Sequence, residues 1–174
     1  MSAKAKKELL FKQPLIKASE AREAGIHPAM LSYYQKRGLL ERVERGLYRN
    51  TQVPLKMDFA WEELYLAVLG IPNGVVAGVS ALALYNITEE IPRFHWIAVS
   101  HETSVAKRPM VKILRYRNYE LGKTFIEKNG LKIPIYDIER VIIDSFRLLS
   151  TEVAIKALKM AFSSKHKPNI RKLG

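Results

Sequence analysis

Residues 21–50 read AREAGIHPAMLSYYQKRGLLERVERGLYRN, and this stretch decides the fold of the N-terminal part of the chain. A helical stretch is expected over 18–24, with Ser19 as the candidate N-cap because its hydroxyl can accept a backbone hydrogen bond. Gly25 follows this stretch, and glycine is the residue most often found just after the last turn of a helix. The sequence therefore predicts a short helix that ends at a tight turn.

A second short helix is expected over 28–37. Pro28 suits the first helical turn, where its missing N–H group is harmless, and Gly38 suits the C-terminal end. On a period of 3.6 residues Leu31 and Tyr34 share one face, which we assign to the core. Two short helices joined by a tight glycine turn predict a helix-turn-helix, whose second helix enters the major groove of DNA.

The residues after this helix alternate apolar and polar side chains over 39–43 and 47–49. The intervening Glu44-Arg45-Gly46 suits a hairpin turn, since glycine adopts the positive φ that such turns need. The pattern predicts a β-hairpin that lies beside the second helix. A hairpin in this position is the wing of a winged helix-turn-helix, and its basic side chains can hold the phosphates that flank the contacted bases.

Two sets of side chains are the candidates for DNA contacts. Polar side chains on the second helix are expected to contact base edges, because amide, ammonium and hydroxyl groups match the hydrogen-bonding groups of the major groove. These candidates are Ser32, Tyr33, Gln35 and Lys36. Arginines are expected to hold phosphates, because the guanidinium group stays charged and matches two phosphate oxygens. These candidates are Arg37, Arg42, Arg45 and Arg49.

The positive charge of the chain is concentrated at its two ends. The formal net charge is +12 over 174 residues. Residues 1–50 hold 11 basic and 5 acidic side chains, residues 51–155 hold 12 of each, and residues 156–174 hold 6 basic and none acidic. Such a surplus attracts polyanions such as nucleic acid. The distribution favours two dedicated binding surfaces over a charge that only serves solubility.

The overall composition describes a folded protein of the cytoplasm. With 48% hydrophobic and 26% charged residues, the chain has the composition of a globular protein that buries a core. The absence of cysteine excludes disulfides, thiolate zinc sites and thiol nucleophiles. No apolar run is long enough for a membrane-spanning helix, and the N-terminal residues lack the apolar core of a signal peptide.

The chain resembles the AbiEi-type antitoxins of bacterial type IV toxin–antitoxin systems. The resemblance to their N-terminal winged-helix region is carried by AREAGI at 21–26, by Leu31 and by RGLLERVERGLYR at 37–49. It continues more loosely through VAGVSAL at 76–82, IYDIERV at 135–141 and KPNI at 167–170.

The resemblance implies an N-terminal domain that binds DNA and a C-terminal antitoxin domain. It also implies repression of the protein's own operon at inverted repeats and a nucleotidyltransferase-like toxin as partner. Since the family's last helices are expected beyond Asn169-Ile170-Arg171-Lys172-Leu173, the C-terminal domain is expected to be shortened.

These patterns predict an α+β protein in which a winged helix-turn-helix precedes a mixed α+β domain. The winged helix-turn-helix is expected at 1–50, a linker at 51–57 and the antitoxin-like domain at 58–174. Within the second domain, Ser80 is a candidate helix cap, Asp137 and Thr151 are candidate helix starts, and Lys128-Asn129-Gly130 is a candidate hairpin turn. Helices are expected at 59–69, 80–85, 137–149 and 152–162, and strands at 95–99, 111–116, 124–127 and 131–135.

A second basic surface is expected at the C-terminal end, where it can meet nucleic acid or an acidic protein. Its candidates are Lys156, Lys159, Lys165, Lys167, Arg171 and Lys172. The helix that carries the first two also has Ile155, Leu158 and Phe162, which we expect to pack inward.

The sequence predicts a DNA-binding repressor and antitoxin that is not an enzyme and uses neither a cofactor nor a metal. The four histidines lack ligand-like spacing, and the chain has no phosphate-binding loop and no nucleophile elbow. Two alternatives stay open. One is a basic protein that binds nucleic acid without sequence preference, and the other is a protein-interaction module whose wing arginines meet an acidic partner. A nuclease would need a carboxylate or histidine cluster, which we do not find.

Overall fold

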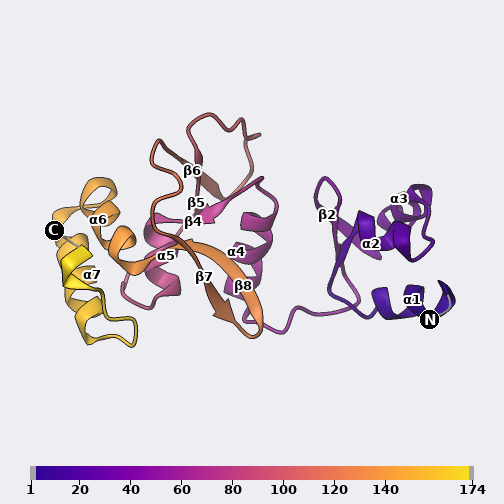
Figure 1. Ribbon diagram of the computed structural model, residues 1–174, viewed down its shortest axis with the longest axis horizontal. Coiled ribbons are helices and arrows are strands. Elements are labelled where there is room, and N and C mark those ends of the chain that lie inside the picture. Colours follow the sequence, from indigo (N-terminus) through magenta and orange to yellow (C-terminus); the bar gives the residue numbers. More distant parts are fainter. Residues whose placement is uncertain (1–2, 173–174) are drawn as a thin grey trace. The chain divides into compact units, whose positions relative to one another are not determined.

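The computed structural model describes residues 3–172 and shows a mixed α+β protein (Figure 1). The chain divides into two compact units, Met1–Gly70 and Ile71–Gly174. The division follows helix α4 (Phe59–Leu69), whereas the sequence places the domain boundary ahead of this helix, in the linker at 51–57. Helix α4 thus belongs to the first unit, and an ion pair described below joins it to the predicted wing.

The first unit combines short helices with a three-stranded sheet. The sheet order is β1-β3-β2, and both pairings are antiparallel. The pairing of β2 with β3 is the predicted hairpin, and Gly46 in its turn has a φ of +87°. The strand β1 was not predicted. The elements before α4 are α1 (Ala3–Leu10), β1 (Leu15–Lys17), α2 (Ala18–Glu23), α3 (Pro28–Lys36), β2 (Leu40–Glu44) and β3 (Leu47–Asn50).

Glycine ends both helices of the predicted helix-turn-helix. After α2, the Gly25 N–H donates to the Arg22 carbonyl and the Ile26 N–H donates to the Ala21 carbonyl. This pair of bonds forms the Schellman motif, in which a residue of positive φ follows the helix. The same pattern closes α3 at Gly38, so both predicted helix ends are confirmed.

The N-cap assigned to Ser19 is wrong, because Ser19 lies inside α2 and the capping position belongs to Lys17. The carboxylate of Glu20, three residues later, accepts the backbone N–H of Lys17 at 3.5 Å. The same carboxylate forms an exposed ion pair with the Lys17 ammonium group at 3.7 Å. Glu20 thus plays the part of the third helical residue of a capping box, which accepts the backbone N–H of the N-cap residue.

A small apolar cluster holds the first unit together. Tyr34 packs against its edge, as the sequence predicted, and so does Tyr48. The ring of Tyr34 meets the ring of Phe11 edge to face, with 5.1 Å between the centroids. Every element from α1 to β2 contributes at least one buried side chain, so the short helices are stabilised mutually. The buried members are Leu10, Ile16, Ala21, Ala24, Ile26, Leu31 and Leu40.

The second unit contains a five-stranded sheet in the order β6-β5-β4-β8-β7. The pairs β5·β6 and β4·β8 are parallel, and β4·β5 and β7·β8 are antiparallel. The β7–β8 hairpin turns at Asn129 and Gly130, both of positive φ, as the sequence predicted. The elements are β4 (Val75–Val76), α5 (Gly78–Leu84), β5 (His95–Ser100), β6 (Val111–Tyr116), β7 (Lys123–Lys128), β8 (Leu131–Tyr136), α6 (Ile138–Leu148), α7 (Thr151–Ser163) and a 3₁₀ turn, η1 (Ile170–Lys172).

Helix α5 is almost completely buried, and Ser80 lies within it rather than at its N-cap. The predicted cap is therefore wrong. The Ser80 hydroxyl accepts the Trp96 N–H at 2.9 Å and donates to the Phe94 carbonyl at 3.3 Å. A buried hydroxyl needs such partners, and here it fastens the helix to the start of β5.

The predicted starts of α6 and α7 are close to those observed. Asp137 is the N-cap of α6 and accepts the Arg140 N–H at 2.9 Å, as expected. The N-cap of α7 is Ser150, one residue before the predicted Thr151.

The inward face of α7 differs from the prediction. Its buried stripe consists of Ala154, Ala157 and Ala161, whereas Ile155 and Phe162 are 41% and 40% exposed. Small residues at this spacing let α7 approach its neighbour α6 closely, which leaves the larger apolar side chains at the side. Within residues 3–172, none of the helices has the length and apolar composition that a membrane crossing requires.

We expect Gly78→Ala to destabilise the protein strongly. Gly78 has a φ of +51°, and a Cβ atom there would lie 2.4 Å from Cε3 of the buried Trp96. The substitution should lower the free energy of unfolding by about 2–4 kcal/mol, since it combines backbone strain with overpacking. Urea unfolding followed by circular dichroism measures this loss.

Gly130→Ala is the matched control. Gly130 has a φ of +79° but no atom within 4 Å of the new Cβ. Only the strain of about 1 kcal/mol should appear there. Equal losses for the two variants would contradict the proposed steric role of Trp96.

Candidate nucleic-acid interface

The polar face of α3 is open to solvent along its length. The four candidates for base contacts, Ser32, Tyr33, Gln35 and Lys36, are all exposed, while Leu31 is buried in the core. Among residues 3–172 the structure gives neither Gln35 nor Lys36 a side-chain hydrogen bond or an ion pair. Gln35 and Lys36 therefore present polar groups that the described residues do not use.

Tyr33 occupies a defined place on this face. Tyr33 is 45% exposed, and the centroids of the Tyr33 and Tyr34 rings are 5.8 Å apart. The Arg37 guanidinium lies 5.2 Å from the centroid of the Tyr33 ring. A guanidinium over an aromatic ring is held by a cation–π attraction that leaves its N–H groups free at the edges. The Tyr33 ring thus orients the Arg37 guanidinium. Tyr33 is a predicted base contact, and Arg37 is a predicted phosphate contact.

The N-terminal end of α3 is capped by its own sequence. The Nδ1 atom of His27 accepts the Ala29 N–H at 3.3 Å, and Pro28 fills the first helical position. The Ser32 hydroxyl donates to the Pro28 carbonyl at 3.5 Å, which is a weak bond within the helix. Ser32 is therefore the only one of the four candidates for which the described residues show such a side-chain hydrogen bond.

The wing hairpin carries two exposed arginines near its tip. Arg45 lies in the turn, and Arg42 lies on β2, where its Nε donates to the Glu44 carbonyl at 3.3 Å. The strand pairing shifts between Arg42 and Glu44, so β2 bulges just before the turn. The tip is joined to the body of the unit because the Ala18 N–H donates to the Gly46 carbonyl at 2.8 Å.

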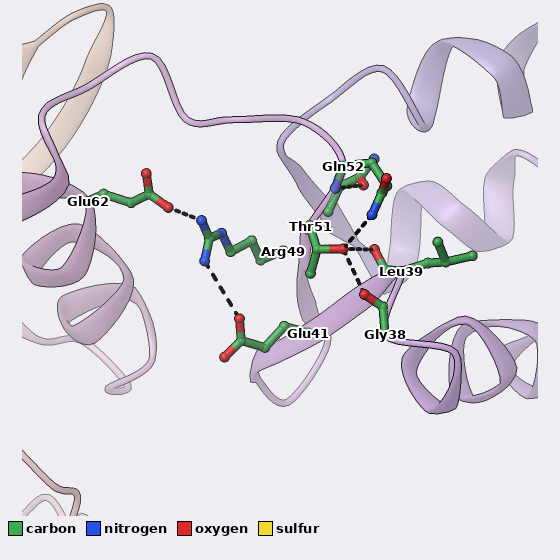
Figure 2. Close-up of polar contacts among 8 residues, drawn as sticks. Gly38, Leu39, Glu41, Arg49, Thr51, Gln52 and Glu62 are labelled. Atoms are coloured by element: carbon green, nitrogen blue, oxygen red, sulfur yellow. Dashed lines mark hydrogen bonds and ion pairs between the residues drawn. The ribbon is translucent and has the colours of Figure 1, made fainter.

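Arg49 has a different environment from the other arginines of the predicted set. Its guanidinium binds the Glu62 carboxylate of α4 and lies 3.7 Å from the Glu41 carboxylate (Figure 2). Its side chain is 29% exposed, and that of Glu62 is 12% exposed. Both carboxylates already neutralise this arginine. The structure therefore gives Arg49 a partner within the protein in place of a free guanidinium.

The strand register separates Arg49 from Arg42. Arg42 lies opposite Tyr48, and Glu41 lies opposite Arg49. Because successive residues of a strand point to opposite faces, Arg42 and Arg49 lie on opposite faces of the hairpin. Both belong to the predicted set of phosphate contacts, but they extend from different faces of the hairpin.

Two polar residues that the sequence analysis did not single out fix the base of the wing. The buried Asn50 side chain donates to the Phe11 carbonyl at 2.8 Å and accepts the Gln52 N–H at 3.0 Å. The Thr51 hydroxyl lies 2.7 Å from the Gly38 carbonyl at the end of α3 (Figure 2). These bonds join the wing to the helix that it flanks. An asparagine at the end of a strand is too common a signal to have predicted these bonds.

The predicted C-terminal basic surface is only partly free. Lys156 pairs with Glu152 at 3.5 Å on the exposed side of α7. The other described members are exposed, and the structure shows them no ion pair within residues 3–172; they are Lys159, Lys165, Lys167 and Arg171. The side chain of Lys172 lies outside the described part of the chain. Within that part, no group of three or more acidic or histidine side chains is placed to hold a metal ion.

One family of known proteins is similar to most of the first unit. Residues 4–51 match the family model described as "Transcriptional regulator, AbiEi antitoxin". This match confirms the resemblance over the N-terminal region and supports, for that region, the role of a transcriptional regulator of the AbiEi antitoxin type. No curated protein matches the chain. The matched region begins in α1 and ends just after β3, so it contains the helices and the hairpin described above.

We expect Glu62→Gln to destabilise the first unit. The change leaves the half-buried Arg49 guanidinium without its better-shielded partner, and charge-assisted hydrogen bonds contribute about 1.5–3 kcal/mol. The matched control is Glu41→Gln, whose carboxylate is 65% exposed and should contribute at most about 1 kcal/mol. Urea titration of both variants measures the difference. Losses of the same size would show that Glu62 is not the dominant partner.

Proposed function

We propose that this protein is a sequence-specific DNA-binding repressor that serves as the antitoxin of a type IV toxin–antitoxin operon. The observation that carries the proposal is the solvent-exposed polar face of α3, which lies within a region that matches AbiEi antitoxin regulators. By this proposal the protein acts in the cytoplasm, binds inverted repeats in the DNA upstream of its own gene and is not an enzyme.

In this proposal α3 contacts the bases and the wing contacts the backbone. Gln35 pairs with adenine and Lys36 donates to guanine, while Ser32 and Tyr33 serve as hydroxyl donors or acceptors. Each good pair contributes about 1–3 kcal/mol of discrimination against the wrong base.

The phosphate contacts fall to three of the four predicted arginines. Arg37, Arg42 and Arg45 are exposed, and the two carboxylates that hold Arg49 make it the weakest candidate. Arg49 instead supports the wing from its other face. Phosphate contacts by exposed arginines supply affinity that does not depend on sequence and falls with salt.

We assign the antitoxin function to the second unit. The support is the resemblance of its sequence segments to AbiEi-type antitoxins, whose partner is a nucleotidyltransferase-like toxin. The exposed lysines of its C-terminal end suit an acidic surface on such a partner or nucleic acid. The arrangement separates DNA binding and toxin control between the two units.

We expect the protein to prefer its own upstream DNA over a scrambled duplex by about a thousandfold. Fluorescence anisotropy with both duplexes at several salt concentrations measures this ratio. The double variant Tyr33→Ala/Lys36→Ala should abolish the preference, because it removes two candidate base contacts. Arg45→Ala should weaken binding to both duplexes and lower the salt slope by about one.

The matched control is Phe125→Ala/Lys132→Ala. It removes one exposed aromatic ring and one exposed lysine from the β7–β8 hairpin and should leave the preference intact. Equal affinity of the unaltered protein for both duplexes would favour a nonspecific basic protein. No binding at low salt would favour a protein-interaction module.

We expect Tyr33→Ala/Lys36→Ala to retain toxin control although it loses operator binding. Growth of cells that produce the partner toxin together with this variant, from a promoter that does not respond to the protein, measures this separation. The unaltered protein and an empty vector define the two limits. Growth arrest with the variant but not with the unaltered protein would assign toxin control to the α3 surface.

A further inference from the structure

The second unit has an apolar groove at one edge of its sheet, outside the surfaces to which a function is assigned above. The groove has a volume of about 680 Å³ and is lined by the segment 90–94, which joins α5 to β5, and by the first residues of β6. The strand β6 is the last strand of the sheet on this side. Val79 and Trp96, which are both largely buried, also line the groove.

Large apolar side chains at this groove face the solvent. Ile91 is 88% exposed, and Phe94 is 48% exposed. Met110, which directly precedes the groove residue Val111, is 58% exposed. A single exposed apolar residue is common on protein surfaces, but a group of them at one groove is typical of a surface that another molecule covers.

The backbone holds Met110 in its exposed position. The Met110 carbonyl accepts the His95 N–H at 2.7 Å, so Met110 lies beside the end of the segment 90–94. Its φ is +56°, a conformation that costs a residue with a Cβ atom about 1–2 kcal/mol. Stability of the fold does not account for a methionine here, since glycine adopts this conformation more readily. A flexible thioether side chain does suit a surface that packs against a partner.

The charges around the groove are balanced. The exposed charged side chains are two acidic and two basic ones, Glu89, Glu90, Arg93 and Lys112. The Lys112 ammonium group lies over the Trp96 ring, 3.5 Å from its centroid. In the described part of the chain the structure shows no ion pair for Glu90 or Arg93. The groove is thus apolar and without net charge, which does not suit a polyanion such as nucleic acid.

A second copy of this chain fits such a surface. The formal net charge of +12 makes two copies repel each other, so they meet with the least repulsion where the surface is neutral. Across a two-fold axis the same patch of both copies is in contact, and every pairing of two residues occurs twice. Glu90 and Arg93 flank Ile91 in the chain, so Glu90 of each copy can pair with Arg93 of the other around an apolar centre.

We propose that this groove is the contact surface of a homodimer, in which Ile91, Phe94 and Met110 of the two copies pack together and Glu90 pairs with Arg93 across the two-fold axis. Stable interfaces bury about 1,600 Å² in total, and a patch built on three apolar side chains is smaller, so the dimer should be weak and reversible. The inference concerns the second unit alone and does not rest on the proposed repressor function. Its consequence for that function is that a dimer brings two copies of α3 to one DNA molecule, as paired half-sites require.

Sedimentation equilibrium of the full-length protein without DNA tests the proposal. At physiological ionic strength the protein should pass reversibly from monomer to dimer, with a dissociation constant of about 10–100 µM. Ile91→Asp should raise this constant at least about tenfold, because it places a charge in the apolar centre of the contact. The urea unfolding midpoint of this variant should stay unchanged, since the Ile91 side chain is exposed in the monomer.

The matched control is Phe125→Asp. It makes the same kind of change at a side chain of the β7–β8 hairpin that is 65% exposed and lies outside the groove. The dissociation constant of the dimer should stay within about twofold of that of the unaltered protein.

An exchange of charges tests whether the partner is a second copy. Glu90→Arg alone and Arg93→Glu alone each bring like charges together twice in a dimer, so both variants should associate at least about tenfold more weakly than the unaltered protein. An equimolar mixture of the two variants restores both pairs of opposite charge in the mixed dimer. The mixture should therefore associate at least about tenfold more tightly than either variant alone.

Three results would overturn the proposal. The first is an unaltered protein that stays monomeric at about 300 µM, which would favour a different protein as the occupant of the groove. The second is an Ile91→Asp variant that dimerises as well as the unaltered protein. The third is a mixture of Glu90→Arg and Arg93→Glu that associates no better than its two components.

Discussion

The exposed face of α3 depends on the burial of its opposite face against a small apolar cluster. A helix of nine residues is too short to be stable alone in water, so packing must hold it. Leu31 is its one buried residue among those described, and Tyr34 supports it from the edge. The side chains of Gln35 and Lys36 are exposed and take no part in this packing. The same packing that stabilises the helix therefore determines which of its side chains are open to solvent, and these are the proposed DNA contacts.

Local sequence signals were sufficient to predict helix ends and turns, because these depend on residues that are neighbours in the chain. Gly25, Pro28 and Gly38 predicted the ends of the short helices, and Asn129-Gly130 predicted a hairpin turn, because each acts through its own backbone conformation. The same kind of reasoning failed for Ser80. Its sequence position suits a cap, but its hydroxyl serves Trp96, which is 16 residues away. The three-residue strand β1 was missed because it is too short to show alternation.

The candidate DNA-binding site shows the same division. The exposure of the polar face of α3 followed from its period, since the apolar positions had to face inward. The sequence pattern did not predict that Arg49 is separated from Arg42. That separation depends on the strand register and on Glu62, which lies on α4, 13 residues after Arg49. In α7 the buried residues are alanines, whereas larger apolar residues of the same helix are exposed. Close packing between helices selected small side chains there, and a count of hydrophobic residues does not detect that preference.

The count of charged residues indicates the charge of the protein surface better in the first unit than in the second. In the first unit the basic surplus appears on the surface, because Arg37, Arg42 and Arg45 are exposed and only Arg49 is held by carboxylates. In residues 51–155 the numbers of basic and acidic side chains are equal, which suggests that no anion would bind there. Equal numbers do not imply equal exposure, however. Asp144 is buried against two arginines, and one of these, Arg147, still extends into solvent. A segment without net charge can thus expose a guanidinium group, since the acidic partner is buried and the arginine extends into solvent.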